Sequence, residues 1–428
     1  MPREMKDSGI EWIGEIPAEW EVAMLKRIAS IQTGSTPAKS EENIYYSTEK
    51  GIPWIKAENL GTNLSIKETT VYLTDDGAKE GRVFEPNTVY VCCIASVGKV
   101  GYSELTASCN QQINALCFKN FNWKYGYYMS CSQEMEYLLN ASGNVMKIIN
   151  SDKQSSIMCP VPPLSEQQKI ADYLDSECAK IDDVITKTKT TIEEYKKLKQ
   201  SVITEAVTKG IRPNREMKDS GIEWIGEIPK EWEISLIKYH LKWKSEKGFS
   251  DEQVLSLYRD YGVIPKDSRD DNHNVTSLDT STYKLVDTGD FVINKMKAWQ
   301  GSMAVSEYRG IISPAYHICE FYSDAFIKRY FHYLMRNNSY LPEYERLSTG
   351  MRIGQWDLGF DDFKNIPIII PSLSEQQEIA DYLDKKCYEI DTLIAKKEQI
   401  VTELESYKKS LIYEYVTGKK EVIQWTAI

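Results

Sequence analysis

The sequence LSEQQKIADYLD (Leu164–Asp175) returns with one substitution as LSEQQEIADYLD (Leu373–Asp384). The first copy follows Pro163 directly and the second begins two residues after Pro371; each has a serine as its second residue, at a favourable N-cap position for a helix. No proline or glycine interrupts either segment until its end. The pattern predicts one long helix over Leu164–Lys209 and a second over Leu373–Gly418.

Apolar residues recur in both segments at alternating steps of three and four. In the first segment they are Ile170, Leu174, Cys178, Ile181, Ile185, Ile192, Tyr195, Leu198, Val202 and Ala206, and in the second Ile379, Leu383, Cys387, Ile390, Ile394, Val401, Leu404, Tyr407, Leu411 and Tyr415. An apolar seam sustained for about six heptads is typical of helices that pack on each other as a coiled coil. A single solvated helix is the alternative.

A second repeat stands before each of two domains. REMKDSGIEWIGEIPAEWEV (Arg3–Val22, box 1) recurs as REMKDSGIEWIGEIPKEWEI (Arg215–Ile234, box 2), with eighteen of twenty positions identical. The chain therefore reads twice as box, domain and helix. The predicted divisions are residues 1–22, 23–163, 164–214, 215–234, 235–370 and 371–428.

Two boxes this similar require equivalent surroundings. Box 2 follows the first long helix directly, so box 1 should lie beside the end of the second long helix. The simplest architecture is a pair of half-molecules about a pseudo-two-fold axis, with antiparallel long helices between two globular domains.

The sequences of the two domains predict a mixed α/β (α+β) fold class. Predicted strands cover residues 53–55, 71–73 and 88–95 in the first domain and 254–258, 290–294 and 315–321 in the second, with helices at 124–139 and 324–336. VYVCCIASVGKVG (Val89–Gly101) aligns with DFVINKMKAWQGS (Asp290–Ser302), and Gly143–Ile148 resembles Gly350–Ile353. The domains therefore share a framework and differ in their polar loops.

Charge and cysteine content narrow the class of protein. The formal net charge is −11, yet residues 23–160 and 235–370 are close to neutral and the acidic excess lies in the boxes and the last helix. The domains can therefore hold basic faces, while the boxes suit protein partners. The absence of a long apolar run, of a signal-peptide pattern and of CxxC pairs favours a cytoplasmic protein with nine reduced cysteines and no zinc site.

The common catalytic motifs are missing from the sequence. There is no GxxxxGK[ST] or GxGxxG phosphate loop, no HExxH, no GxSxG and no Asn/Asp-Pro-Pro-aromatic tetrad of an amino-methyltransferase. The four histidines have no metal-ligand spacing. We therefore expect a protein that is not an enzyme and that binds no cofactor or metal itself.

The doubled LSEQQ helices, the doubled GIEWIGEIP boxes and the two unlike domains together resemble the specificity subunits of type I restriction–modification systems. The resemblance covers essentially the whole chain. It implies that each domain recognises one half of a bipartite, asymmetric DNA site and that the helices set the spacer. It also implies partners: two methyltransferase subunits that use S-adenosylmethionine, and restriction–translocation subunits that use ATP. The cofactors would then be bound by these partners.

Residues that read DNA need paired donors and acceptors for base edges, or cationic and hydroxyl groups for phosphates. We expect them on the polar loops that follow strands. The candidates are Ser35, Thr36, Lys39, Ser96, Lys99, Asn110, Gln111, Gln112 and Lys147 in the first domain, and Arg259, Tyr261, Asn294, Lys295, Lys297, Trp299, Gln300, Arg352, Gln355 and Trp356 in the second.

Each candidate has a structural alternative. A lysine at a turn is often merely solvated, Asn110–Gln112 can cap a turn, and Trp299 and Trp356 can belong to the core. A competing function is a coiled-coil adaptor that binds only proteins, which explains the helices and acidic boxes but not the divergent polar loops. Strong preference for one DNA site would distinguish a reader from an adaptor.

Overall fold

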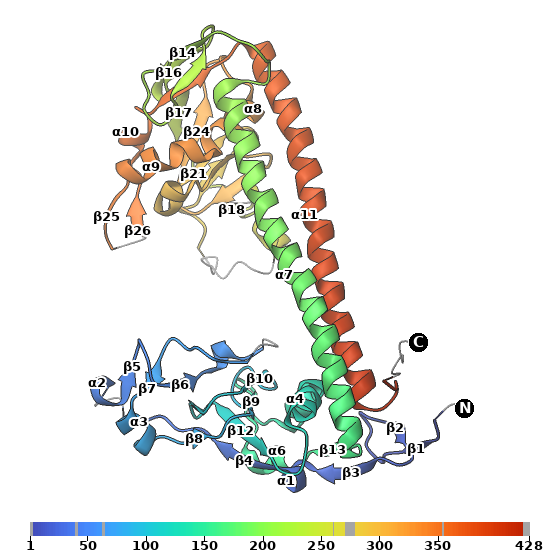
Figure 1. The fold of residues 1–428 in the computed structure, drawn as a ribbon. Coiled ribbons are helices and arrows are strands. Elements are labelled where there is room, and N and C mark those ends of the chain that lie inside the picture. Colours follow the sequence, from blue (N-terminus) through green and yellow to red (C-terminus); the bar gives the residue numbers. More distant parts are fainter. Residues whose placement is uncertain are drawn as a thin grey trace. The chain divides into compact units, whose positions relative to one another are not determined.

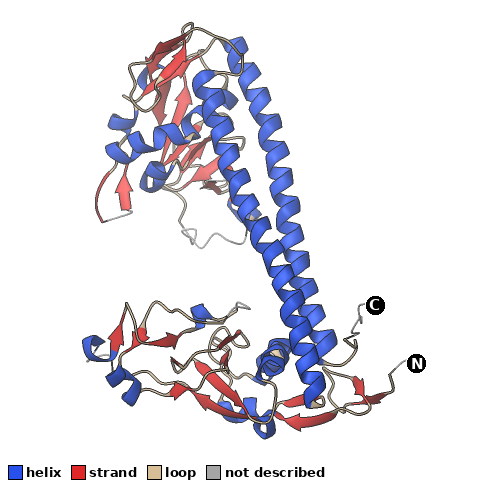
Figure 2. Cartoon of the chain, in the orientation of Figure 1, coloured by secondary structure: helices blue, strands red, loops and turns tan. Residues whose placement is uncertain are grey.

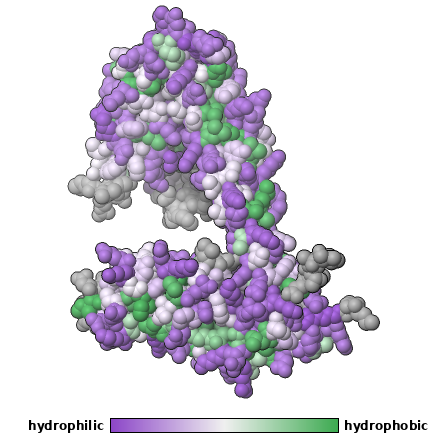
Figure 3. All heavy atoms as spheres, in the orientation of Figure 1, coloured by the Kyte–Doolittle hydropathy of each residue, from purple (hydrophilic) through white to green (hydrophobic). Residues whose placement is uncertain are grey.

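The computed structural model describes residues 3–38, 42–61, 65–259, 261–269, 279–352 and 355–422. The chain divides into two compact units: Met1–Lys189 with Glu398–Ile428 (unit 1), and Thr190–Lys397 (unit 2). Both units combine helices with sheets (Figures 1 and 2), as the predicted mixed fold class requires. Hydrophilic side chains dominate the surface of each unit in the view of Figure 3. No helix in these ranges is both long and apolar enough to cross a bilayer.

The two predicted long helices are α7 (Leu164–Lys209) and α11 (Leu373–Val416). Each helix continues from one unit into the other, so each unit contains a piece of both. Ion pairs join the pieces: Asp182–Lys408 and Lys189–Glu405 in unit 1, and Lys199–Asp391 in unit 2. Later residues of α7 meet earlier residues of α11, so the pieces pair antiparallel within each unit, as predicted.

The predicted apolar seam is buried over most of its length, including Leu174, Ile192 and Val401. The prediction is wrong for two residues of the seam, because Leu198 is 48 % exposed and Tyr407 is 56 % exposed. A pair of helices encloses only one narrow stripe on each partner. Leu198 and Tyr407 lie on the flank of that stripe, where water covers them.

Both boxes fold as the same β-hairpin. Strand β1 (Met5–Asp7) pairs with β2 (Glu15–Pro17), and β14 (Met217–Asp219) pairs with β15 (Glu227–Pro229). The register is identical, since the first residue of each hairpin faces its proline. The near-identity of the two sequences therefore extends to their backbone pairing.

Box 1 lies against the end of α11, as predicted from the repeat. Tyr413 donates to the carbonyl oxygen of Trp12 at 2.9 Å, and Lys419 donates to that of Ile13 at 2.8 Å. The helix ends at Val416, two residues before the predicted end; Gly418 follows it with a φ of +71°, and a side chain there would meet Pro17 at 2.4 Å. Glycine is therefore required at this C-terminus.

A glutamate in the first turn of a long helix ties each box to that helix; it is half-buried in unit 1 and buried in unit 2. In unit 1, Glu166 accepts hydrogen bonds from Trp20 Nε1 at 2.8 Å and from Arg3 at 2.6 Å. In unit 2, Glu375 accepts from Trp232 Nε1 at 3.1 Å and pairs with Arg215. Both arginines also pair with a box glutamate, Glu19 in unit 1 and Glu231 in unit 2.

A two-stranded ribbon carries the chain into and out of each domain. Strand β3 (Glu21–Met24) pairs with β13 (Met158–Val161) in unit 1. Strand β16 (Glu233–Leu236) pairs with β27 (Pro367–Ile370) in unit 2. The strand after each box therefore lies beside the strand that leads into the next long helix.

The central sheet of unit 1 has the order β10-β9-β12-β4. Its strands are β10 (Val100–Ser103), β9 (Thr88–Cys92), β12 (Ile113–Phe118) and β4 (Ala29–Thr33). A second sheet has the order β5-β7-β6-β11-β8, with strands β5 (Tyr46–Ser47), β7 (Tyr72–Leu73), β6 (Ile52–Ile55), β11 (Ala107–Cys109) and β8 (Val83–Phe84). Short helices α1 (Leu25–Ile28), α2 (Glu42–Tyr45), α3 (Asp75–Glu80) and α6 (Ser151–Ser155) complete the domain.

Unit 2 repeats this central sheet as β22-β21-β24-β17, all antiparallel. Its strands are β22 (Met303–Val305), β21 (Phe291–Asn294), β24 (Tyr316–Phe321) and β17 (Leu241–Lys244). Hairpins and pairs surround it: β18 (Leu255–Tyr258) with β19 (Gly262–Pro265), β20 (Lys284–Val286) with β23 (Gly310–Ile312), and β25 (Thr349–Arg352) with β26 (Gln355–Asp357). The alignment of β9 with β21 that the sequence suggested is therefore confirmed.

The helix predicted at 124–139 is two helices, α4 (Trp123–Ser132) and α5 (Glu134–Asn140). Gln133 interrupts them with a ψ of +11°. Its amide is buried and donates to Cys159 Sγ at 3.1 Å, a contact with β13 that local periodicity does not reveal. In unit 2, α8 (Lys328–Arg336), α9 (Leu341–Leu347) and α10 (Phe360–Phe363) occupy the region after β24.

Candidate nucleic-acid interface

The loop after β4 and the turn before β12 meet in unit 1. The Thr36 hydroxyl donates to Gln111 Oε1, and the Asn110 amide donates to Gln112 Oε1 at 3.2 Å. Asn110 Oδ1 also accepts from the backbone of Gln112 at 3.1 Å, so it caps its own turn. Gln111 remains exposed at the tip, while Ser35 is half-buried beside it. The structure thus brings five candidates together: Ser35, Thr36, Asn110, Gln111 and Gln112.

A strained loop adjoins this place. Ala95, between β9 and β10, has a φ of +65°, a left-handed conformation that a residue with a Cβ rarely adopts. This is why the strand predicted at 88–95 ends at Cys92. The Ala95 amide donates to the carbonyl oxygen of Lys147 at 3.0 Å. The side chains of Ser96, Lys99 and Lys147 are all exposed around this loop.

A backbone hydrogen bond joins the Asn110–Gln112 turn to the loop around Ala95. The amide of Cys93 donates to the carbonyl oxygen of Gln112 at 2.8 Å. Burial raises the pKa of the Cys93 thiol to about 12, so this side chain is neutral and inert beneath the loops. Except for Lys39, which lies outside the described residues, the candidates of the first domain lie on loops that backbone hydrogen bonds join.

Sequence reasoning missed two basic residues beside these loops. The backbone amide of Arg82 donates to Ser35 Oγ at 2.7 Å, and its guanidinium donates to the carbonyl oxygen of Thr33. Lys56 directly follows β6, and its Nζ lies 5.3 Å from the centre of the Trp54 ring. The sequence could have indicated Lys56, because it directly follows the strand predicted at 53–55. Only its tertiary contacts with Ser35 and Thr33 show that Arg82 lies beside these loops.

In unit 2 a 3-10 helix, η5 (Lys295–Gln300), occupies the loop between β21 and β22. The amide of Lys295 donates to the carbonyl oxygen of Ala315 at 3.3 Å, and its own carbonyl accepts from Leu358 at 3.2 Å. The rings of Trp299 and Trp356 lie 5.1 Å apart, both half-buried. Asn294, Lys297 and Gln300 belong to the same loop. Arg352 and Gln355 lie in β25 and β26, and their side chains are outside the described part of the chain.

Arg259 and Tyr261 occupy a different turn, between β18 and β19. The guanidinium of Arg336 donates to the Arg259 carbonyl oxygen, and that of Arg269 lies 4.3 Å from the centre of the Tyr261 ring. The hairpin that carries these two candidates packs on β22, the strand that follows η5, since a side chain on Gly262 would lie 3.5 Å from the Cβ atom of Ala304.

Comparison of the two central sheets reveals another missed residue. Thr36 lies three residues after the end of β4, and Lys247 lies three residues after the end of the equivalent strand β17. Lys247 is exposed and forms a β-bridge with Lys284. Divergent loop sequences hide this equivalence until the strands are paired.

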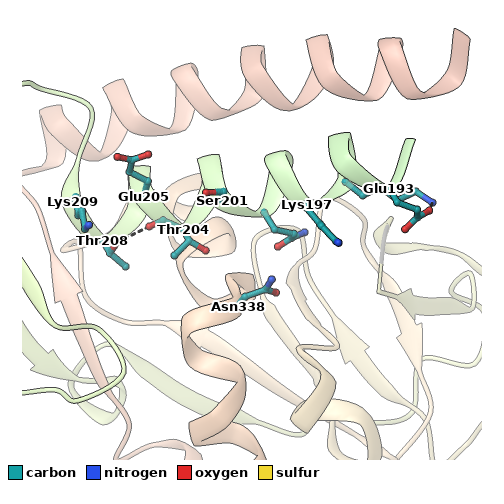
Figure 4. A pocket seen from close by; sticks show the side chains of 10 residues that line it. Glu193, Lys197, Ser201, Thr204, Glu205, Thr208, Lys209 and Asn338 are labelled. Carbon is teal, nitrogen blue, oxygen red and sulfur yellow. Dashed lines mark hydrogen bonds and ion pairs between the residues drawn. The ribbon is translucent and has the colours of Figure 1, made fainter. Parts of the chain in front are cut away.

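A groove of about 720 Å³ in unit 2 lies elsewhere, along the last turns of α7. Figure 4 shows the side chains of these turns on one side and Asn338 on the other. The lining mixes lysines with glutamates, including Glu193, Lys197 and Glu205. In the described ranges no cluster of histidine, cysteine and carboxylate side chains forms a metal site, and all nine cysteines are free thiols.

Comparison with known proteins identifies related sequences over nearly the whole chain. The family described as the type I restriction modification DNA specificity domain matches residues 17–194 and 229–403. The type I restriction enzyme MjaVIII specificity subunit of Methanocaldococcus jannaschii is 25% identical, across 95% of this chain and 94% of the relative. The EcoKI specificity subunit of Escherichia coli is 20% identical, across 97% of this chain and 92% of the relative.

A solved structure shows the same fold. It comes from work on complex assembly and conformational transition of the type I R-M system. The TM-score is 0.68 at 14% sequence identity, and the match covers 95% of this chain and 99% of that chain.

Proposed function

The chain belongs to the family of type I restriction–modification DNA specificity proteins, and on that premise we propose that it is the sequence-specific DNA-binding subunit of a type I complex. Each unit recognises one half of a bipartite, asymmetric DNA site. The observation that carries this proposal is the repeated central sheet, with the same strand order in both units and different polar loops at matching positions. A shared framework with divergent loops suits two readers of different sequences.

The subunit has partners that supply the chemistry. Its relatives are specificity subunits, the non-catalytic members of such complexes, and the related structure comes from a type I assembly. We infer that two methyltransferase subunits and restriction–translocation subunits join this chain. S-adenosylmethionine and ATP would be bound by those partners. The nine free cysteines are consistent with the cytoplasm, where we place the complex.

Methylation mapping tests the proposal directly. Genomic DNA from a host that expresses the chain with its methyltransferase subunits should carry methylated adenine in one bipartite motif with an unread spacer. The purified complex should prefer that motif over random DNA by ~10³ or more. Binding that is weak and indifferent to sequence would support the adaptor function instead. The chain alone, mixed with DNA and S-adenosylmethionine, should transfer no methyl group.

Lys147→Ala should weaken DNA binding by the complex through one half-site only. If Lys147 contacts a phosphate, all sequences should weaken alike and the slope of log affinity against log salt should fall by about one. If it contacts a base, discrimination at that position should fall by ~1–3 kcal/mol.

Lys119→Ala is the matched control, because Lys119 is also exposed but follows the opposite end of β12 from the Asn110–Gln112 turn. Equal effects of the two substitutions on affinity and salt slope would show that Lys147 has no special place in the interface.

A further inference from the structure

Two buried lysines of unit 2 have opposite electrostatic surroundings. The side chain of Lys244, at the end of β17, is 8 % exposed and pairs with Asp287 and, at 3.1 Å, with Asp290. Lys284, the first residue of β20, is 6 % exposed, and its Nζ donates to the carbonyl oxygen of Tyr316 at 2.7 Å. Among the residues that the structure describes, no carboxylate pairs with Lys284.

The charges that act on Lys284 are themselves positive. Its pKa is lowered by burial and then by the charges of Lys295 and Lys247. Lys247 is its partner in a β-bridge. Lys295 lies nearby. Its backbone amide donates to the carbonyl oxygen of Ala315, and the next residue, Tyr316, supplies the carbonyl oxygen that accepts from Lys284 Nζ. Three lysines therefore converge without a compensating acid in the described ranges.

Lys244 shows what the same sheet provides for a structural lysine. Burial lowers its pKa, but the hydrogen bonds that Lys244 donates to Asp287 and Asp290 outweigh burial and raise the pKa overall. Lys284 has a backbone carbonyl and an aromatic ring as partners but no carboxylate, so its buried positive charge is not neutralised and is less favourable than that of Lys244. Such unsatisfied charge is typical of a binding site that waits for a ligand of opposite sign.

The position of the cluster identifies the ligand. Tyr316 pairs with Asn294 in the central sheet, so the lysines lie beside the η5 loop of candidate reading residues. The ring of Trp243, 48 % exposed, lies 5.9 Å from Lys284 Nζ and adds an apolar wall. A site of several cations next to a DNA-reading loop fits an oxygen anion of the DNA backbone.

We propose that Lys284, Lys247 and Lys295 form an anion site that holds one phosphate of the DNA backbone in the half-site recognised by unit 2. The inference rests on the proposed function and adds a positioning contact to it. Phosphate contacts set the register of a protein on DNA without specifying bases. Lys284 is therefore a positioning residue, and its removal should act on every DNA sequence alike.

The test uses the complete complex with its methyltransferase subunits. Lys284→Met should weaken binding about ten-fold to both the mapped site and random DNA, the loss expected for one charge-assisted hydrogen bond. The slope of log affinity against log salt should fall by about one. Lys247→Met, at an exposed position, should lower the slope in the same way without any risk to folding.

Stability separates a binding role from a structural one. Lys284→Met should lower the thermal midpoint of the free protein much less than Lys244→Met does, because it removes a buried charge that no carboxylate neutralises, together with one hydrogen bond to a backbone carbonyl. Lys244→Met is the matched control, and it should lower the midpoint while leaving the salt slope unchanged. If both substitutions lowered the midpoint and neither changed the slope, Lys284 would be a structural lysine and the proposal would be wrong.

The identity of the anion is tested with modified DNA. Methylphosphonate substitution, one position at a time, should reveal a phosphate whose neutralisation weakens the wild type but not Lys284→Met. If inorganic phosphate stabilises the wild type and no DNA position behaves in this way, the site binds free phosphate and the DNA assignment is overturned. If the wild-type complex prefers no DNA site at all, the proposed function itself fails, which is a distinct result.

Discussion

Exchanging residues 23–160 for the equivalent domain of a relative changes one half of the recognised DNA site and leaves the other half unchanged. The structural reason is the ribbon of β3 and β13, where Ala23 pairs with Cys159 and Val22 with Pro160. The cuts therefore fall side by side on one ladder, and box 1 keeps its contacts with both long helices. The relative's domain has to replace the contacts that Lys124 and Tyr125 make with these helices. Preference for the old site should fall by ~10³ and appear for a new one. Methylation mapping of the two hosts measures the change.

The matched exchange in unit 2 uses the ribbon of β16 and β27, with cuts at Ser235 and its partner Ile368. It should alter the other half-site and leave the first intact. If either exchange changed both halves together, the units would not read DNA independently and the assignment of one half-site to each unit would have to be abandoned.

Glu375→Ala should destabilise unit 2 by about 3–5 kcal/mol, because it leaves the indole N–H of Trp232 buried without its acceptor and the buried Arg215 with only the exposed Glu231 as a partner. The side chain of Glu375 is 3 % exposed and that of Arg215 is 11 % exposed, so water cannot replace the lost contacts. The unfolding midpoint should fall by roughly 10 °C for a unit of this size. Thermal denaturation followed by tryptophan fluorescence would report it.

Two glutamates provide graded controls. Glu166 makes the same contacts in unit 1 but is 21 % exposed, so Glu166→Ala should be less harmful. Glu378, one residue beyond Gln377 on α11, pairs with Arg212 on the surface, and both side chains are nearly half exposed. Glu378→Ala should change stability by at most about 1 kcal/mol. An equal loss for Glu375→Ala and Glu378→Ala would contradict the role given to burial.

The amino-acid sequence alone determined the architecture of this protein, because its decisive signals are local or repeated. The uninterrupted periodicity from Leu164 and from Leu373 specifies the helices, since each turn is stabilised within the segment itself. The near-identity of the two boxes required equivalent surroundings, and the contacts of Tyr413 and Lys419 with box 1 meet that requirement. Strand positions such as β21 followed from apolar runs bounded by turns.

Contacts between residues far apart in sequence were decided only by the tertiary structure. Gln133 breaks a helix because its amide meets Cys159 on another strand, and Leu198 is exposed because a neighbouring helix covers only one stripe. The same holds for the candidate interface. Lys244 and Lys284 are both lysines at the edge of a strand, and their sequences give no reason to separate them. The folded sheet places two aspartates beside one and two lysines beside the other, and that difference in charge over a few ångströms makes one structural and the other a candidate for binding.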